Sequence, residues 1–486
     1  MCKRQPAEAG FFSKFTIQND YGGRSSVGRA LVCGTSGRGF KPRRSPHYYF
    51  YMKTKDLQRA KGVRDFGPVE KIQRNEITQT LQQVFESFGY NPIETPIIER
   101  YELFGSKYGI GNESEAMQET FKFKDQGKRD LVLRTEFTVP FSRFVAMNPQ
   151  LKKPFKRYQI GQVFRDGPIK LGRYREFWQC DVDVVGLSAA GIDAEIVQLT
   201  QEAFDKLGLD VIIKINNRKI LNAILNKINI KEESRDSVIV SIDKLDKIGF
   251  VGVAKELEEK GLDKSSIKNL EKYLIASGKN EDIIAELESL LGDQEGLEEL
   301  KQTLNLLPNS ANVEFLPSLA RGLAYYTGNI FEVFLKDQTK LSSSLAAGGR
   351  YDQMIGGLLG SKQEIPAIGI SFGLETIFDA MNLQSDRNEK ISTVETYLIS
   401  MDKKNAGELF DIAKELRNND IKTDICYKYK KLKQGLEFAN DYNIGWVIIL
   451  GEDEVKKNKV TLRNMETGKQ EMITLKKAIS RIKKKS

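Results

Sequence analysis

The sequence predicts a mixed α+β protein with a helical segment in its middle and a separate α/β domain at its C-terminal end. Three observations support this architecture. Strand patterns separated by short loops occur up to about residue 217 and return after residue 306. Leu and Ile recur at helical spacing among Lys and Glu from 218 to 305, and strands alternate with helices beyond residue 393. A chain of 486 residues is expected to form roughly two to four domains.

The first part of the chain is punctuated by glycine and proline. The predicted elements are a helix at Lys71–Gly89, a strand entering a helix at Leu131–Phe144, two strands within Lys156–Gly186, a helix at 190–207 and a strand at Asp210–Ile215. Gly89 is a helix-stop signal, and Gly167-Pro168 marks the loop Asp166–Gly172 between the two strands.

Strand patterns return after the helical segment. They are predicted at Asn312–Leu316, at Asn329–Phe334, at AAGGRYD (Ala346–Asp352) and within Ile365–Phe378. The C-terminal alternation consists of strands at Glu395–Ile399, Thr423–Ile425, Gly445–Leu450 and Lys459–Asn464, with helices at Ala406–Asn418 and Lys431–Tyr442. Strands separated by helices predict a largely parallel C-terminal sheet.

The composition excludes several classes of protein. An apolar content of 40% with 29% charged residues is typical of a globular chain, and no apolar run approaches the roughly 20 residues of a membrane span. The four cysteines contain no CxxC pair, which argues against a zinc site or a disulfide framework and suits the cytoplasm. Residues 393–486 hold 20 Lys/Arg against 14 Asp/Glu, a basic balance suited either to a polyanion or to a solvated surface.

Residues 1–51 do not follow the periodicity of the rest. They hold nine Lys/Arg and two Asp/Glu and have no apolar core of a signal peptide. Ser25–Pro46 resembles the translation of a tRNA gene, so we expect a non-native or disordered leader, with Met52 as the true start. The leader also carries the single histidine, His47, which leaves the rest of the chain without a histidine for catalysis.

Two segments carry the clearest motifs. FRDGPIKLGRYREFWQCDVDVVG (Phe164–Gly186) combines an arginine, a loop, two further arginines and an alternating strand, and RGLAYYTG (Arg321–Gly328) places an arginine beside paired tyrosines. Both resemble segments of the histidyl-tRNA synthetases, a family of class II aminoacyl-tRNA synthetases. The resemblance extends through most of residues 60–486. No GxxxxGK[ST] or GxGxxG motif is present to suggest another nucleotide-binding fold.

The resemblance implies a domain plan. It predicts a catalytic domain with an antiparallel sheet, formed by 52–217 and 306–386, a helical insertion at 218–305, and an α/β anticodon-binding domain at 393–486. In the family, the helix, strand and proline segment containing Pro96 builds a homodimer interface. The implied activity is that of a cytoplasmic histidine–tRNA ligase, which uses ATP and Mg²⁺ to form histidyl-adenylate and transfers histidine to the 3′ end of histidine tRNA.

Attack of a carboxylate on the α-phosphate of ATP requires positioned positive charge, and arginine binds such oxyanions in bidentate fashion. By resemblance, Arg165 and Arg321 are the catalytic residues and hold the α-phosphate from two sides. Arg173 and Gly373 complete the ATP site. A structural ion pair is the alternative role for each arginine.

The histidine substrate requires acceptors for its ammonium group and complementary polar groups for its imidazole. The resemblance assigns this pocket to Glu136, Thr138, Gln179, Asp183, Tyr325 and Tyr326, with the first three near the ammonium group and with Asp183 and Tyr326 near the imidazole. Gln179, Asp181 and Asp183 alternate along one predicted strand, so their side chains share one face. Composition alone would instead favour a solvated sheet surface.

Two residues depart from the family pattern. Ala324 stands where an acidic residue precedes the tyrosines, and Thr376 stands where class II motif 3 has an arginine that contacts ATP. Either Arg350 or another cation compensates, or ATP binding is impaired. The alternative function is a non-catalytic regulatory paralogue, similar to the regulatory subunit of ATP phosphoribosyltransferase. A class II synthetase for another amino acid and an RNA-binding accessory protein are further alternatives.

Overall fold

The computed structural model describes residues 57–107, 119–169, 172–276, 278–308, 310–321, 325–383, 391–400, 402–427 and 431–484. The predicted leader 1–51 and the proposed start Met52 lie outside these residues, as does Ala324. None of the described helices is both long and apolar enough to cross a membrane.

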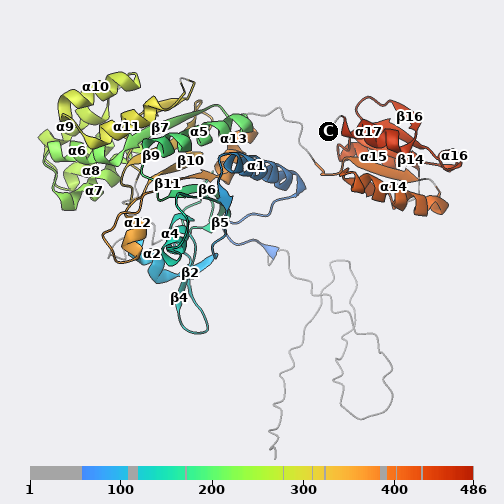
Figure 1. Cartoon of the computed structure of the whole chain (residues 1–486), viewed down its shortest axis with the longest axis horizontal. Helices are drawn as coiled ribbons and strands as arrows, with labels where there is room; N and C mark the ends of the chain where they lie inside the picture. The colour runs from blue at the N-terminus through green and yellow to red at the C-terminus, as the bar shows by residue number, and fades with distance from the viewer. Residues whose placement is uncertain are drawn as a thin grey trace, which may run out of the picture. The chain divides into compact units, whose positions relative to one another are not determined.

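An eight-stranded sheet forms the centre of the first part of the structure (Figure 1). Its order is β1-β5-β6-β11-β10-β9-β7-β8, and its strands are β1 (Asn91–Pro92), β5 (Phe155–Phe164), β6 (Glu176–Val185), β7 (Val211–Asn217), β8 (Val313–Phe315), β9 (Asn329–Leu335), β10 (Ala346–Arg350) and β11 (Ala367–Gly373). The six inner strands pair antiparallel, whereas the edge strands β1 and β8 pair parallel. The predicted antiparallel sheet is therefore confirmed, with parallel edges added.

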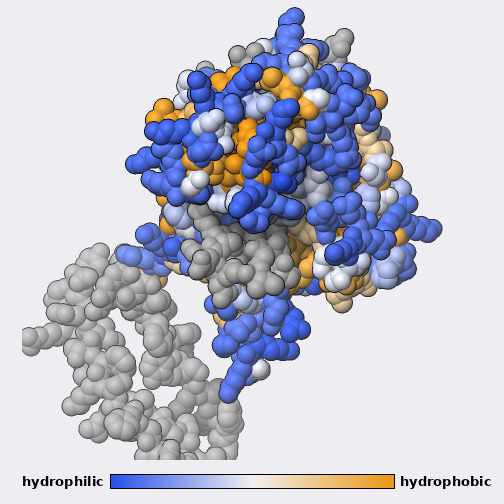
Figure 2. All heavy atoms as spheres, turned by 90° about the vertical axis from the view of Figure 1, so that its left-hand side faces the viewer, coloured by the Kyte–Doolittle hydropathy of each residue, from blue (hydrophilic) through white to orange (hydrophobic). Residues whose placement is uncertain are grey.

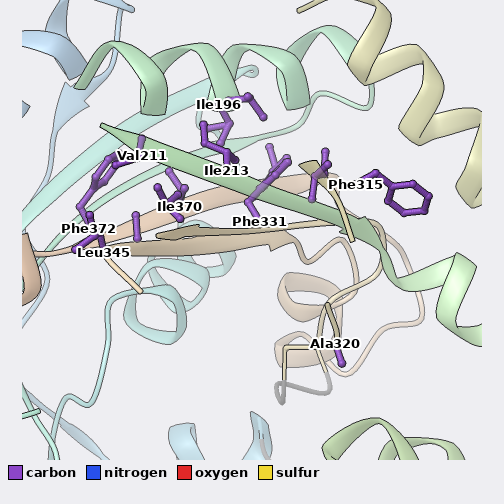
Figure 3. Packing of buried hydrophobic residues seen from close by; sticks show 14 of the residues in the cluster. Ile196, Val211, Ile213, Phe315, Ala320, Phe331, Leu345, Ile370 and Phe372 are labelled. Atoms are coloured by element: carbon purple, nitrogen blue, oxygen red, sulfur yellow. The ribbon is translucent and has the colours of Figure 1, made fainter. Parts of the chain in front are cut away.

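Helices pack on both faces of this sheet (Figure 1). They are α1 (Pro68–Ser87), α5 (Ala190–Leu207) and α13 (Leu374–Leu383) on one face, and α2 (Tyr101–Lys107), α4 (Thr138–Met147) and α12 (Met354–Leu358) on the other. The first face holds the main hydrophobic core, in which Ile196 of α5 packs over Ile213, Phe331 and Ile370 of the sheet (Figure 3). A separate small sheet, in the order β2-β4-β3, contains β2 (Ile98–Arg100), β3 (Lys122–Lys124) and β4 (Asp130–Leu133).

The described part of the segment predicted to be helical contains six helices. These are α6 (Arg218–Lys227), α7 (Glu232–Ile242), α8 (Leu245–Glu259), α9 (Lys264–Leu274), α10 (Asn280–Leu291) and α11 (Glu295–Asn305). Their buried Leu and Ile side chains join the main core, as the helical spacing predicts. Figure 2 looks onto this side and shows hydrophobic side chains among hydrophilic ones; the exposed apolar residues of these helices include Val240, Ile248 and Val251.

The C-terminal part is a five-stranded sheet in the order β13-β12-β14-β15-β16. Its elements are β12 (Thr396–Ser400), η2 (Lys403–Asn405), α14 (Ala406–Asn418), β13 (Thr423–Ile425), α15 (Leu432–Asp441), β14 (Trp446–Leu450), α16 (Glu452–Lys456), β15 (Val460–Asn464), β16 (Gln470–Ile473) and α17 (Leu475–Lys483). Two hydrophobic clusters cover the two faces of this sheet. One contains side chains of α14 and α17, and the other contains side chains of α15.

The prediction of a largely parallel C-terminal sheet is wrong for half of the strand pairs. β12 pairs parallel with β13 and β14, whereas β14–β15 and β15–β16 are antiparallel. The physical reason is the length of the connections. A parallel pair needs a crossover of a dozen or more residues, and the segments after β14 and after β15 are shorter than that.

Candidate active site

The alternation of β6 places two kinds of side chain on opposite faces of the sheet. Cys180, Val182 and Val184 enter the main core. Asp181 and Asp183, on the opposite face, are each only 3 % exposed. The prediction that Gln179, Asp181 and Asp183 share one face is therefore confirmed. We call this side of the sheet the polar face. It is largely buried, so the alternative of a solvated surface is wrong.

Three of the positions opposite these residues on the neighbouring strands are glycines. Gln179 pairs with Gly161 of β5 and with Gly373 of β11, and Asp183 pairs with Gly369 of β11. Further along this row of the sheet, Gly369 pairs with Gly349 of β10. A sheet position without a side chain leaves room above the backbone for a ligand or for another chain segment.

Asp183 is held by two partners on the polar face. Its carboxylate forms an ion pair with the fully buried Arg157 of β5 and accepts a hydrogen bond of 2.5 Å from the hydroxyl of Tyr351. Burial raises the pKa of Asp183, and the charge of Arg157 and the hydrogen bond from Tyr351 act against that rise. The Tyr325 ring lies edge-on to the Tyr351 ring at 6.3 Å and is 4.6 Å from the Tyr326 ring.

Tyr326 approaches the same row of the sheet at Gly349 of β10. A Cβ on Gly349 would lie 2.9 Å from its ring, so the absence of a side chain there allows the tyrosine to approach. The structure thus brings Asp183 near Tyr325 and Tyr326, a pair that follows it by more than 140 residues in the sequence.

Gln179 and Asp181 are linked through Ser371 of β11. The amide nitrogen of Gln179 donates to the Ser371 hydroxyl at 2.8 Å, and Ser371 hydrogen-bonds the Asp181 carboxyl. Within the part of the chain that the structure describes, Oε1 of Gln179 and Oδ1 of Asp181 are buried without a partner. Burial raises the pKa of Asp181 to about 8, against the charge of Arg157 and with the charge of Asp183 adding to the rise.

Glu136 lies at the start of α4. Its carboxylate accepts hydrogen bonds from the backbone N–H groups of Thr138 at 3.2 Å and Val139 at 3.0 Å. These orphan donors of the first helical turn fix the orientation of the carboxylate. Glu136 also contributes negative charge at Asp181, so the two lie within electrostatic range of each other.

Arg165 follows directly after β5. Its Nε donates to the carbonyl oxygen of Thr135 at 3.1 Å, and its guanidinium lies 5.0 Å from the centroid of the Phe177 ring. Arg173, in the β5–β6 loop, forms an ion pair with Glu119. Residues 170 and 171 of this loop lie outside the described residues.

Arg321 has a left-handed backbone conformation, with φ of 42°, and its Nη1 lies 3.0 Å from Oε1 of Glu332. Burial acts most strongly and lowers the pKa of Arg321, but the charge of Glu332 and its other neighbours outweighs burial and raises the pKa overall. The row Asp181, Ser371, Ala347 and Glu332 crosses four strands of the sheet. Because Glu332 belongs to this row, its ion pair with Arg321 connects the arginine to the same row of residues as Asp181.

Thr376 stands where class II motif 3 has an arginine, and its side chain is bonded to the backbone. Thr376 donates to the carbonyl oxygen of Gly373 at 3.0 Å, and its methyl group lies 3.1 Å from where a Cβ on Gly172 would be. Arg350, considered as a compensating cation, is buried in ion pairs with Asp193 and Asp352. That possibility is not supported, because withdrawing Arg350 would leave a buried carboxylate unpaired.

Comparison with known proteins agrees with this geometry. Residues 62–377 match the family model described as histidyl-tRNA synthetase, and residues 395–485 match the model of an anticodon binding domain. The chain belongs to the histidyl-tRNA synthetase family. A relative named histidine–tRNA ligase 1 from Bacillus cereus is 42% identical over 85% of this chain and 96% of its own length. Histidine–tRNA ligase 2 from Shouchella clausii is 39% identical over 87% of this chain and 99% of its own.

Solved structures of the histidyl-tRNA synthetase family share the fold. The histidyl-tRNA synthetase of Nostoc sp. PCC 7120 superposes with a TM-score of 0.77 at 27% identity and covers 88% of this chain and 99% of its own. A protein from Bacillus halodurans, described as an ATP phosphoribosyltransferase regulatory subunit/histidyl-tRNA synthetase, has a TM-score of 0.68 at 23% identity and covers 82% of this chain and all of its own. At that identity the second likeness shows the fold alone.

Several residues of this candidate site were not predicted from the sequence. They are Arg157, Glu332, Tyr351 and Ser371. Burial alternates only around Ser371, which is half-buried between two buried neighbours, whereas Arg157 is buried beside the equally buried Tyr158. What the spacing does not provide is the register that places Arg157 opposite Asp183 and Ser371 opposite Asp181.

Proposed function

We propose that this chain is a histidine–tRNA ligase. The observation that carries the proposal is the polar face, where Gln179 and Asp183 lie in one strand between the segments that carry Arg165 and Arg321. Membership of the family, with the anticodon binding domain matched, supports it. In the first step the carboxylate of histidine attacks the α-phosphate of ATP and releases pyrophosphate. In the second step a terminal ribose hydroxyl of tRNA attacks the adenylate carbonyl.

The two arginines would neutralise the negative charge that develops at the α-phosphate. Arg165 is held at its Nε by Thr135, which leaves the outer edge of the guanidinium as a fork for two oxygens. Arg321 precedes β9 in the chain and is oriented by Glu332 of that strand. Fixed donors of this kind require little reorganisation during the reaction, which is why they lower the barrier.

The histidine pocket would use the acceptors of the polar face. Glu136, Thr138 and Gln179 would surround the ammonium group, and Asp183, Tyr325 and Tyr326 would surround the imidazole. Arg173 and Gly373 would contact ATP. Gly373 suits this role because it pairs with Gln179 and presents no side chain above the sheet.

Mg²⁺ is proposed to enter as its complex with ATP. Among the described residues no group of three or more His, Cys, Asp or Glu side chains could hold a metal ion. In proteins Mg²⁺ is usually held by substrate phosphates and water with one or two carboxylates. The bound ion would supply charge neutralisation at the phosphates.

The remaining parts of the proposal concern partners. The proposed domain plan keeps 52–217 with 306–386 as the catalytic domain, 218–305 as the insertion and 393–486 as the anticodon-binding domain. Residues 393–486 hold more Lys and Arg than Asp and Glu, and this positive charge suits the polyanionic tRNA. A homodimer formed through the segment around Pro96 and a cytoplasmic location complete the proposal.

The test is amino-acid-dependent exchange between ATP and pyrophosphate, on protein starting at Met52, with each of the twenty amino acids. Exchange with histidine alone is the expected result, followed by charging of histidine tRNA. The second candidate is the regulatory paralogue, favoured by Thr376 in the motif 3 position. Folded protein that catalyses no exchange with any amino acid would support that candidate instead.

A further inference from the structure

A positively charged side chain lies beside the segments proposed to hold ATP and is not fully paired. Arg64 belongs to the stretch that precedes α1, and its side chain is 24% exposed. Nε and Nη2 of Arg64 are buried, and neither has a hydrogen-bond partner among the residues that the structure describes. Leaving buried donors without an acceptor is costly to the folded protein, so open donors beside a substrate site suit an anionic ligand.

The backbone before Arg64 is attached to the loop between β5 and β6. The carbonyl oxygen of Gly62 accepts a hydrogen bond of 2.9 Å from the backbone N–H of Arg175. Gly62 has a left-handed φ of 86°, and a Cβ at this position would collide with the Arg175 side chain. This attachment holds Arg64 next to the loop that carries Arg173, a residue of the proposed ATP site.

An aromatic ring of the same loop orients the Arg64 side chain. The guanidinium carbon of Arg64 lies 3.4 Å from the centroid of the Tyr174 ring. A guanidinium that stacks on a ring keeps its N–H groups in the plane of the fork, where they remain available to oxygen atoms. Oε1 of Glu375 lies 3.9 Å from Nη2 of Arg64, which is too far for a hydrogen bond. Arg64 is therefore oriented while its donors stay open.

Glu375 is satisfied by other donors. Its Oε1 accepts a hydrogen bond of 2.7 Å from Nη2 of Arg74, and its Oε2 accepts one of 2.9 Å from the backbone N–H of Trp178. The side chains of Arg74 and Glu375 are almost fully buried. The carboxylate that faces Arg64 is therefore shared with a closer arginine and is not free to turn toward Arg64.

Arg64 also lies beside the position where an arginine is missing. Glu375 directly precedes Thr376 in α13, and the Thr376 side chain lies beside Gly172 of the β5–β6 loop. Thr376 and Arg64 thus lie against the same two segments, α13 and this loop. Arg350, the other cation considered for this role, is committed to buried ion pairs. Of these two arginines, only Arg64 has donors that are open to a ligand.

The phosphates of ATP suit this side chain better than the adenine base does. The rings of Tyr174 and Phe66 lie 3.4 Å and 4.9 Å from the guanidinium carbon of Arg64, so stacking partners are already present. The open donors lie instead at the edge of the guanidinium. Phosphate oxygens accept from such an edge in bidentate fashion.

We propose that Arg64 is a further ATP-binding residue, which donates hydrogen bonds to the phosphate chain of ATP and supplies part of the positive charge that Thr376 does not provide. Tyr174 is the positioning residue that orients its guanidinium. This inference rests on the proposed function, because it takes ATP as the substrate of the site.

The experiment measures histidine-dependent ATP–pyrophosphate exchange for the unsubstituted protein and for Arg64→Met. We expect KM for ATP and KM for pyrophosphate each to rise by about 10-fold, the usual effect of losing a hydrogen bond to a charged group. KM for histidine should stay unchanged, which also shows that the variant is folded. Adenosine, used as a competitive inhibitor against ATP, should keep its inhibition constant because it has no phosphates.

Two results would overturn the proposal. The first is an unchanged KM for ATP in the Arg64→Met protein. The second is weaker inhibition by adenosine with an unchanged KM for pyrophosphate, because the contact would then be with the base. Arg59→Met is the matched control, since Arg59 lies in the same stretch but pairs with Asp65 at 3.7 Å through a side chain that is 54% exposed. This control should keep all three KM values.

The double variant Arg64→Met with Thr376→Arg separates a contact with ATP from a purely structural role. An arginine introduced beside the same segments returns a donor to the site, so KM for ATP should recover by about 3-fold or more relative to Arg64→Met. A structural role of Arg64 would leave KM for ATP without recovery, and that result would contradict the proposal.

Tyr174→Leu provides another variant if Arg64→Met does not fold. It removes the ring that orients the guanidinium, so KM for ATP and KM for pyrophosphate should each rise by about 3-fold. Unchanged values of both would contradict the proposal. Failure of the proposed function is distinguishable from all of these results, since it appears as no histidine-dependent exchange in the unsubstituted protein.

Discussion

Arg157 and Asp183 form an ion pair beneath the polar face in which the side chains are 0 % and 5 % exposed. The arginine also lies 4.3 Å from the centroid of the Phe141 ring, and its Nε and Nη1 have no hydrogen-bond partner among the described residues. Burial removes both charged groups from water. The attraction between the two charges and the hydrogen bond from Tyr351 to Asp183 must therefore offset the lost hydration. A buried charge of this kind is tolerated only while its partner is present.

Replacing Arg157 alone should therefore be strongly destabilising. We expect Arg157→Met to lower the free energy of unfolding by about 3–5 kcal/mol, since Asp183 would keep a buried charge without a counter-ion. Unfolding in urea, followed by circular dichroism, measures the change. The double variant Arg157→Met with Asp183→Asn should recover part of the loss.

Arg129→Met is the matched control for this experiment. Arg129 is paired with Asp125 at the surface, where its side chain is 72% exposed, and such pairs are worth about 0–1 kcal/mol. If Arg157→Met cost no more than this control, the buried pair would not be a determinant of the folded state.

Much of the element order was predictable from the sequence, because it depends on local periodicity. The α1 and α5 helices and the β5 and β6 strands lie where glycine signals and alternation place them. The C-terminal hairpin from β15 to β16 was not predicted, since β16 is short and carries little alternation.

The candidate site was predictable only where a residue lies within a recognisable segment. Gln179 and Asp183 could be named from such a segment, and their shared face followed from the period of a strand. Arg157 and Ser371 could not be named, because their relation to Asp183 and Asp181 depends on strand register between segments distant in the sequence. The ion pair of Arg350, on β10, with Asp193, on α5, likewise joins segments that are distant in the sequence.

The raised pKa of Asp181 predicts a pH dependence of stability. Its pKa is about 8 in the folded protein, against an ordinary value of 3.8, so the folded state binds more protons than the unfolded state between these pH values. The contribution of Asp181 to the free energy of unfolding therefore falls as pH rises from about 4 to about 8 and is constant above that. Arg157, Asp183 and Glu136 act on this carboxyl electrostatically.

Asp181→Asn isolates the effect of the one group. Urea unfolding of both proteins between pH 5 and pH 9 should give a difference curve in which the variant gains relative stability as pH rises. A flat difference curve would mean that Asp181 has an ordinary pKa.

Gly369 is predicted to accept no side chain. A Cβ there would collide with the carboxylate of Asp183 and with the backbone of β6, so Gly369→Ala should cost about 1–3 kcal/mol of stability and reduce histidine-dependent exchange. Gly191→Ala is the control, because nothing lies within 4 Å of its new methyl group in α5. That variant should gain about 0.5–1 kcal/mol from helix propensity. Equal effects of the two substitutions would contradict the close packing described for Gly369.

Thr376 offers a test of how ATP is held without the motif 3 arginine. The residue is 8 % exposed, and its side chain lies beside Gly373 and the loop residue Gly172, both in segments assigned to ATP. We expect Thr376→Arg to lower KM for ATP by about 3- to 10-fold through a new charge-assisted hydrogen bond, while KM for histidine stays the same. Thr376→Met controls for the added length without the charge and for the lost bond to Gly373. Arginine and methionine variants with the same KM for ATP would mean that another cation of the protein already supplies the charge at this position.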